Sequence, residues 1–405
     1  MTSNKYTKAP VYVAGLGVIS AIGSNVAECL DALEHERPGM GEIDTLDTLH
    51  RKQFPVAGVK AGNEELAASL GVPPGVSRTA LLSLIAAKEA LASSGLEGRS
   101  SWRIGMVSAN TVGGMDKTEH FFKSFLEDPK KGRLKDVVGH ECGSITEWVA
   151  DRLGIHAYTT TINTACSSSA NALYFAARLI RHGILDVVLA GGTDALTKFT
   201  LNGFNTLMIL DKEYCIPFDE DRRGLNLGEG AGYTVLVSQQ VADSLQKAPV
   251  CRLTGFCNRN DAYHQTASSP DGKGSYLAMQ GALESGGLQP SDIDYINLHG
   301  TGTQNNDLAE GTAIQRLFDP RYPKMSSTKS FTGHTLGASG GIEAVFSALS
   351  VQRDLIYPNL RFRTPMKELP FTPETRLIKN IPVKHVLSNS FGFGGNCSSL
   401  IFSKL

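Results

Sequence analysis

Residues 159–181 read TTTINTACSSSANALYFAARLIR, and this stretch decides the fold class. Its first residues are β-branched and favour a strand. The part from Ser168 to Arg181 is rich in alanine, leucine and arginine and favours a helix, and the serines at its beginning are typical of a helix start. A strand that leads into a helix within a few residues is the repeating unit of an α/β fold.

The same alternation of short strands and longer helices continues on both sides of this stretch. Residues 186–195 and 232–238 are almost continuously apolar, which is typical of strands in a sheet that is covered on both faces. We therefore expect an α/β protein with buried sheets. Further strands are expected at 11–18 and 103–110, and further helices near 25–35, 78–95 and 143–153.

The chain also predicts two similar halves. The polar segment 238–249 is typical of a surface crossing, after which 251–260 begins a new strand and 294–303 repeats the pattern of a strand followed by a glycine turn. The internal similarity is weak, so the duplication is a structural expectation and not a sequence repeat. We expect an N-terminal half at 1–245 and a C-terminal half at 246–405.

Composition excludes several classes of protein. The 405 residues are 41% hydrophobic and 20% charged, as in ordinary globular chains, and a net charge of -1 gives no overall field that would attract nucleic acid. No run of 18 apolar residues predicts a membrane span, and no signal-type segment begins the chain. The seven cysteines show no C-x-x-C pair, so we expect no metal site and a reduced, cytoplasmic setting.

Cys166 is the candidate nucleophile. It stands between the β-branched run and the helix that Ser167 and the serines after it open, where backbone N–H groups and the helix dipole favour a thiolate. A lone cysteine at a strand end also suits a small buried residue. The other motifs of the chain favour the nucleophile.

Two histidines stand in turn-rich segments. INLHGTGTQNNDLAE (296–310) places His299 at the end of an apolar strand, and SSTKSFTGHTLGASGG (326–341) holds Lys329 and His334 before a helix rich in alanine and glycine. Loops at strand ends commonly present catalytic side chains. Each segment alone also suits a structural histidine or a tightly packed helix.

SNSFGFGGNCSS (388–399) contains a glycine-rich turn whose backbone can approach a ligand and supply an N–H donor, although it also suits a hairpin turn. The chain has no G-x-x-x-x-G-K-[ST] and no H-E-x-x-H, which leaves nucleotide hydrolysis and zinc proteolysis without their usual motifs.

In this order, Cys166, His299, Lys329, His334 and the GFGG turn resemble the elongating (type I/II) β-ketoacyl-[acyl-carrier-protein] synthases of the thiolase-like superfamily. The resemblance covers nearly the whole chain and extends to VYVAGLGVISAIG (11–23), IPFDEDRRGLNLGEGAG (216–232) and DAYHQTASSP (261–270). It implies a thiolase-like fold of two similar α/β halves in α-β-α-β-α layers, with the cysteine in the first half and both histidines in the second.

The resemblance also implies the chemistry, a decarboxylative condensation of an acyl thioester with malonyl-carrier protein that extends a fatty acid, polyketide or polyene chain. Cys166 would hold the acyl group, and the backbone N–H groups of Cys166 and Phe393 would form the oxyanion hole. His299 and His334 would bind the malonyl thioester and promote decarboxylation. Lys329 would support His334 through a charge network with Glu310. Asp307 and Glu310 would orient the histidine loop, although carboxylates on a helix are also often simply solvated.

Other implied features concern substrates and partners. Phe393 resembles a gate residue, and Phe204 and Thr118 fall where the acyl pocket would be lined. Acyl carrier protein is the expected partner, and DPKKGRLK (128–135) is a candidate docking patch that is equally well explained as a solvated loop. The resemblance implies a homodimer, or a heterodimer with a related ketosynthase-like subunit, and no metal or redox cofactor. The basic residues of the patch are Lys130, Lys131, Arg133 and Lys135.

Two motifs depart from the family pattern. Many members read HGTST-P and GFGGTN, where this chain reads HGTGTQNND and GFGGNC, which suggests a specialised pathway such as aryl polyene synthesis. Cys397 invites a thiolase interpretation, which its position and the two histidine motifs disfavour. Two alternatives stay open, a thiolase-like acyltransferase without decarboxylation and a partner subunit that sets chain length without turnover.

Overall fold

The computed structural model describes residues 9–43, 46–96 and 101–405, and it confirms the alternation of strands and helices. The segment that decided the fold class forms β3 (Tyr158–Ile162), a sharp turn and α6 (Ser168–Arg181). The remaining helices are α1 (Val26–Glu34), α2 (Asn63–Leu70), α3 (Arg78–Ser93), α4 (Met115–Glu127), α5 (Cys142–Leu153), α7 (Lys198–Thr206), α8 (Gln239–Ser244), α9 (Lys273–Gly286), α10 (Gln304–Phe318), α11 (Lys329–Thr332) and α12 (Ser339–Arg353).

Ten strands form one continuous sheet that consists of two sets of five strands. From the outer edge inward, the first set has the order β3-β2-β4-β5-β1 and the second set has the order β8-β7-β11-β12-β6. Corresponding strands therefore follow one another in the same order in both sets. In each set the inner two pairings are antiparallel and the outer two are parallel. A short antiparallel contact of Tyr12 and Val13 with Arg252 and Cys251 joins β1 to β6. The strands of the sheet besides β3 are β1 (Val11–Ser20), β2 (Ile104–Ala109), β4 (Val187–Asp194), β5 (Gly230–Ser238), β6 (Cys251–Asn260), β7 (Tyr295–Asn297), β8 (Lys324–Ser326), β11 (His385–Gly392) and β12 (Asn396–Ser403), and β9 (Leu355–Ile356) pairs with β10 (Ile378–Lys379) outside it.

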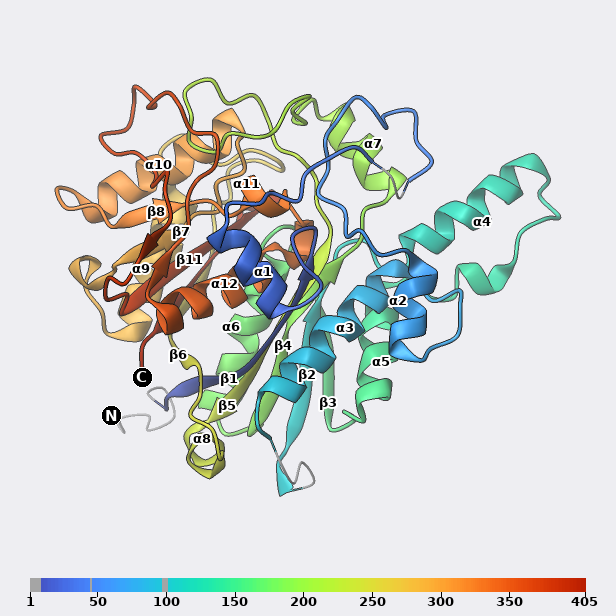
Figure 1. Cartoon of the computed structure of the whole chain (residues 1–405), viewed down its shortest axis with the longest axis horizontal. Helices are drawn as coiled ribbons and strands as arrows, with labels where there is room; N and C mark the ends of the chain where they lie inside the picture. The colour runs from blue at the N-terminus through green and yellow to red at the C-terminus, as the bar shows by residue number, and fades with distance from the viewer. Residues whose placement is uncertain (1–8, 44–45, 97–100) are drawn as a thin grey trace.

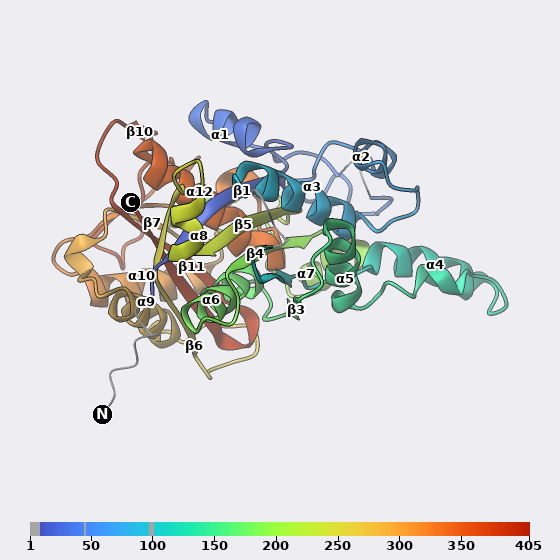
Figure 2. The ribbon, with the colours of Figure 1, turned by 90° about the horizontal axis from the view of Figure 1, so that it is seen from below.

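Helices cover both faces of each five-stranded set. α6 and α12 contact each other and strands of both sets, so they form a central layer, and the side chains of α12 are buried from Ser339 to Val351. α3 covers β1 and β5 on one outer face, and α9 covers β6 and β12 on the other (Figures 1 and 2). The order of layers is α-β-α-β-α, which confirms the predicted fold class.

The proposed boundary between residues 245 and 246 stays a prediction. It falls after the short helix α8 and before β6, which starts the second strand set. The two strand sets share the central helices, and α12 of the second set packs on β5 of the first. The halves are therefore similar in layout but do not have separate cores.

The helix α4 projects from the layered body (Figures 1 and 2). None of its residues is buried, and Phe122, Phe125 and Leu126 expose large apolar side chains from one side of the helix. Leu134 and Val138, in the segment that returns to the body, are also exposed. In the described parts of the chain, no helix is long and apolar enough to cross a membrane.

Candidate active site

Cys166 sits on a strained turn between β3 and α6. Ala165, just before it, has a left-handed φ of 53°, which is costly for a residue with a Cβ atom. The turn is held because Ser168 N donates to Ala165 O over 3.0 Å and Thr164 N donates to Ser168 Oγ over 2.8 Å. Strain held in this way is often found at functional sites.

The C-terminal glycine turn packs directly on the cysteine turn. A Cβ atom on Gly392 would lie 2.8 Å from Thr164 O and 3.2 Å from Cys166 N, so the contact requires glycine. Below it, Asn396 Oδ1 accepts hydrogen bonds from Ser167 Oγ at 3.0 Å and from Asn171 Nδ2 at 2.7 Å. The polar cluster fixes the two turns, and thus Cys166 and Phe393, relative to each other.

The backbone amides of Phe393 and Cys166 both face the thiol and help its anionic form. Burial is the larger effect and raises the pKa of Cys166 to about 11, against the opposing charge of Lys329 and the two amides. The backbone amides thus favour the thiolate, but desolvation outweighs them, so the pKa of the thiol lies above its usual value. An oxyanion-hole role for these two amides stays a prediction.

His299 and His334 lie edge to face, with ring centroids 5.4 Å apart, and both are buried. The end of β7 presents His299, whose backbone N–H donates to Glu310 Oε1 over 2.9 Å. Glu310 Oε2 accepts from Gly300 N over 2.8 Å, so the Glu310 carboxylate binds two successive backbone N–H groups of the histidine loop. Burial raises the pKa of Glu310 to about 7.

Both histidines are neutral near pH 7. Burial, followed by the charge of Lys329, holds the pKa of His299 and of His334 well below the usual 6.5. Leu336 N donates to His334 Nδ1 over 3.2 Å, and the Ser339 hydroxyl oxygen lies 3.0 Å from the same nitrogen. A backbone N–H only donates, so Nδ1 is the acceptor and the proton of His334 stands on Nε2.

Lys329 is buried beside the histidines, and its charge partner differs from the one that the sequence suggested. Its Nζ lies 2.5 Å from Glu343 Oε1 on α12 and 3.4 Å from His299 Nδ1. The charge partner is thus Glu343 and not Glu310, and the histidine that Lys329 contacts is His299 and not His334. Burial raises the pKa of Glu343 to about 7.

Asp307 also orients the histidine loop. Its carboxylate accepts from Thr301 N over 3.0 Å, from Gly302 N and from Phe218 N. The side chain is fully buried, and burial raises its pKa. Asp307 is therefore not a solvated carboxylate but a support of the loop that carries His299.

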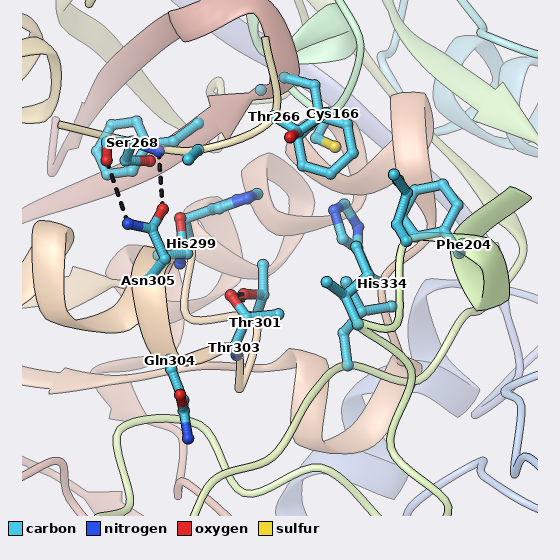
Figure 3. A pocket seen from close by; sticks show the side chains of 18 of the residues that line it. Cys166, Phe204, Thr266, Ser268, His299, Thr301, Thr303, Gln304, Asn305 and His334 are labelled. Atoms are coloured by element: carbon cyan, nitrogen blue, oxygen red, sulfur yellow. Dashed lines mark hydrogen bonds between the residues drawn. The ribbon is translucent and has the colours of Figure 1, made fainter. Parts of the chain in front are cut away.

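Cys166, His299 and His334 line one pocket of about 370 Å³ (Figure 3). Phe393 and Phe204 line it too, and their rings stack with centroids 5.9 Å apart. Their roles as gate and acyl-pocket residues stay predictions. Apolar side chains such as Leu207, Ile209 and Leu225 line the pocket as well. The polar part of the lining includes Asn305, whose side chain exchanges two hydrogen bonds with the backbone of Ser268 (Figure 3).

Two predicted groups lie elsewhere. Thr118, on α4, bonds to His140 Nδ1 over 2.9 Å and does not line this pocket. The basic patch of Lys130, Lys131 and Arg133 is exposed in the segment that follows α4 and does not line the pocket either. An acyl-pocket role for Thr118 and a docking role for the patch stay predictions.

Sequence reasoning missed Glu343 and Asn396. Glu343 is one acidic residue in a helix of small apolar residues, and this unusual placement was the available signal. The sequence shows Asn396 only as part of a variant glycine turn. Cys397 lines the pocket near the turn as well, but no described group of three or more His, Cys, Asp or Glu side chains could hold a metal ion.

Comparison with known proteins places this site in a family. Residues 8–242 match the family model for the N-terminal domain of beta-ketoacyl synthases, and residues 250–363 match the model for their C-terminal domain. The chain belongs to the β-ketoacyl synthase family. It is therefore an enzyme of the acyltransferase class, a ketosynthase of thiolase-like fold.

Relatives agree over nearly their full length. The chain is 32% identical to 3-oxoacyl-[acyl-carrier-protein] synthase 2 of Staphylococcus aureus (strain N315), covering 97% of this ketosynthase and 98% of the relative. It is 31% identical to the protein of the same name from Vibrio cholerae, covering 98% and 100%.

Solved structures of ketosynthases also superpose on nearly the whole chain. The ishigamide ketosynthase/chain length factor superposes with a TM-score of 0.93 at 28% identity, covering 98% of this chain and 100% of that one. The ketosynthase ApeO of Xenorhabdus doucetiae, solved in complex with its chain length factor ApeC, superposes with a TM-score of 0.85 at 29% identity and 98% coverage of both chains.

Proposed function

We propose that this ketosynthase performs a decarboxylative condensation of a Cys166-bound acyl group with malonyl-carrier protein. The observation that carries the proposal is one pocket in which Cys166, two facing backbone amides and two neutral histidines meet. A Claisen condensation between thioesters needs these parts: a nucleophile, an oxyanion site and hydrogen-bond donors for an enolate.

In the first step, the Cys166 sulfur attacks the thioester carbonyl of an acyl group on the phosphopantetheine arm of the carrier. The amides of Cys166 and Phe393 stabilise the oxyanion. The bond from the carbonyl carbon to the carrier sulfur then breaks, and the proton from Cys166 ends on the departing carrier thiol. Removing one such donor typically slows acyl transfer by about a hundred- to a thousandfold.

In the second step, the malonyl thioester oxygen accepts hydrogen bonds from the Nε2–H groups of His299 and His334. The bond to the malonyl carboxylate breaks, carbon dioxide leaves, and its electron pair forms an enolate that the two donors stabilise. The enolate carbon attacks the acyl carbonyl on Cys166, the carbon–sulfur bond breaks, and the thiolate takes a proton from water. These steps use no metal or redox cofactor.

Lys329 acts through His299 in this scheme. An ammonium group only donates hydrogen bonds, so its contact with His299 Nδ1 keeps the proton of that ring on Nε2. Glu343 holds the ammonium in place. Lys329 therefore positions a donor and does not attack substrate.

Intact-mass measurement of wild type and Cys166→Ala, after incubation with acyl-carrier protein and then malonyl-carrier protein, tests the proposal. We expect an acyl adduct on wild type alone and a product two carbons longer that forms only with the malonyl carrier. Absence of the adduct would favour a chain-length subunit. Product formation without loss of carbon dioxide would favour a non-decarboxylating acyltransferase.

We also propose two macromolecular partners. Acyl carrier protein delivers the substrates, and the basic patch after α4 complements its acidic surface. A second ketosynthase-like chain, identical or related, covers the apolar face of α4 and the β3 edge, which pairs only with β2 among the described strands. The homologous ApeO was solved with such a partner, its chain length factor.

For the pathway, we propose elongation of a polyene-type chain, with aryl polyene synthesis as the leading case. Support comes from the variant HGTGTQNND and GFGGNC motifs and from the likeness to ketosynthases that work with chain length factors. A cytoplasmic setting agrees with seven cysteines that are all free thiols. Product analysis with aryl and linear starter carriers distinguishes this pathway from primary fatty acid synthesis.

A further inference from the structure

Asp194, at the end of β4, is a fully buried carboxylate that touches no charged partner in its hydrogen bonds. Its Oδ1 accepts from the backbone N–H groups of Thr111 at 2.8 Å and Val112 at 3.1 Å. Its Oδ2 accepts from Thr111 Oγ1 and from Gly337 N, both at 2.7 Å. The group thus ties the start of the α4 segment to the turn that follows His334.

That turn is strained at one residue. Leu336 has a left-handed φ of 52°, which is costly for a side chain with a Cβ atom. Such a conformation persists only where neighbouring contacts determine it. Two contacts flank Leu336: its own N–H donates to His334 Nδ1, and the next N–H, of Gly337, donates to Asp194.

The fit between the turn and the carboxylate is close. A Cβ atom added to Gly337 would lie 2.7 Å from Asp194 Oδ2 and 2.9 Å from Thr111 Cγ2. Any larger residue at 337 would push the turn off the carboxylate. Glycine at this position is therefore explained by the approach of Asp194 and not by backbone conformation.

We propose that Asp194 is a positioning residue of the condensation: by anchoring the Gly337 amide it holds Leu336 in its strained conformation, and the Leu336 N–H, together with the Ser339 hydroxyl that lies 3.0 Å from His334 Nδ1, keeps the His334 proton on Nε2. This role rests on the proposed function of His334 as the donor to the malonyl thioester. Asp194 itself does not line the pocket.

Asp194→Asn tests this role because it preserves size. Asn presents one acceptor oxygen and one NH2 group. In either orientation the NH2 group faces a backbone N–H, of Gly337 on one side or of Thr111 and Val112 on the other, so one anchor is lost. The turn then loses the contact that balances its strain.

Asp219→Asn is the matched control. Asp219 is also buried, and it accepts hydrogen bonds from the backbone N–H groups of Asp221, Arg363 and Thr364. It does not line the pocket of Cys166. Asp219→Asn removes a similar set of backbone hydrogen bonds elsewhere in the fold. It therefore measures the effect of losing such hydrogen bonds where His334 is not disturbed.

The first readout is nitrogen-15 NMR of histidine-labelled protein, with His334 assigned from His334→Ala. We expect a neutral Nε2-protonated ring in wild type and Asp219→Asn, and a mixture of tautomers in Asp194→Asn. A wild-type ring that carries its proton on Nδ1 would overturn the proposal even if the variant failed to fold. This readout needs no turnover, so it is independent of the proposed function.

The second readout separates the two half-reactions. In Asp194→Asn, decarboxylation of malonyl-carrier protein should fall about 100-fold, as for a misplaced catalytic group. Acylation of Cys166 should not fall, because the negative charge of Asp194 raises the pKa of that thiol and its removal favours the thiolate. Equal losses in both half-reactions, or no loss in either, would contradict a positioning role. If the wild type itself catalyses no condensation, the proposed function fails. The NMR result alone then decides the role of Asp194.

Discussion

At the scale of single residues, burial sets the protonation of the site. It raises the pKa of the Cys166 thiol and lowers the pKa of both histidines, so the resting pocket holds a thiol and two neutral imidazoles. Neutral imidazoles with Nε2–H groups are hydrogen-bond donors to a developing enolate. A thiol that ionises only with difficulty reacts once a bound thioester and the two amides stabilise the charge that forms.

The raised thiol pKa predicts the pH dependence of alkylation. Only the thiolate reacts with iodoacetamide, so the rate at Cys166 should still be rising above pH 9 and should reach half of its maximum near pH 11. Peptide mass spectrometry of alkylated protein follows Cys166 apart from the other cysteines. A rate that levels off below pH 8 would show that the resting group is a thiolate and would contradict this account.

The pair of Lys329 and Glu343 predicts a large effect of Glu343→Gln. Loss of one partner leaves a buried charge uncompensated and should lower the free energy of unfolding by roughly 3–5 kcal/mol. Condensation should fall as well, because Lys329 no longer keeps its place beside His299.

Glu374→Gln supplies the control for this substitution. It breaks the half-exposed pair with Lys324 and should change the free energy of unfolding by less than about 1 kcal/mol. Urea unfolding followed by circular dichroism measures both variants. Similar small changes for the two variants would show that the buried pair does not support the fold or the site.

At the scale of elements, α4 is a helix with apolar side chains that do not pack against the rest of the chain. Phe122, Phe125 and Leu126 would pack against a core in an ordinary amphipathic helix, yet here they face away from the body. We therefore expect a partner chain to cover them.

The double substitution Phe122→Glu with Leu126→Glu tests this surface by light scattering. Wild type, alone or co-expressed with a related ketosynthase-like chain, should have the mass of two chains of about 43.4 kDa, and the double variant the mass of one. Leu49→Glu, at another exposed apolar side chain, should leave the mass unchanged. A double variant that keeps the two-chain mass would place the partner surface elsewhere.

The sequence was sufficient for elements whose signal is local. The strand, turn and helix around Cys166 and the strand before His299 follow from propensity, and these elements were predicted within a residue or two. The contact of Lys329 with Glu343 depends on how α11 packs against α12, so the unusual acidic residue in α12 is a signal for a buried charge but does not name its partner. The contact of Asp194 with the Gly337 turn joins residues 143 positions apart, which no local pattern predicts. The position of Thr118 likewise depends on the projection of α4, which no local pattern encodes.

At the scale of the whole molecule, duplication explains where the site lies. β3 leads to α6 in the first strand set, and β8 leads through α11 to α12 in the second. Cys166 stands just before α6 and His334 just before α12, so equivalent ends of the two central helices supply the nucleophile and a donor. The repeated strand order shows that the two halves are equivalent. Their sequences are too different to show more than the recurring pattern of a strand followed by a glycine turn.

The central claim is that condensation at Cys166 is driven by loss of the malonyl carboxylate. Its most direct test is a single turnover of acylated enzyme with malonyl-carrier protein whose free carboxyl carries carbon-13. We predict one labelled carbon dioxide for each elongated product, with neither formed by Cys166→Ala acylated under the same conditions. Elongated product that retains the label, or label released without any product from fully acylated enzyme, would contradict the account.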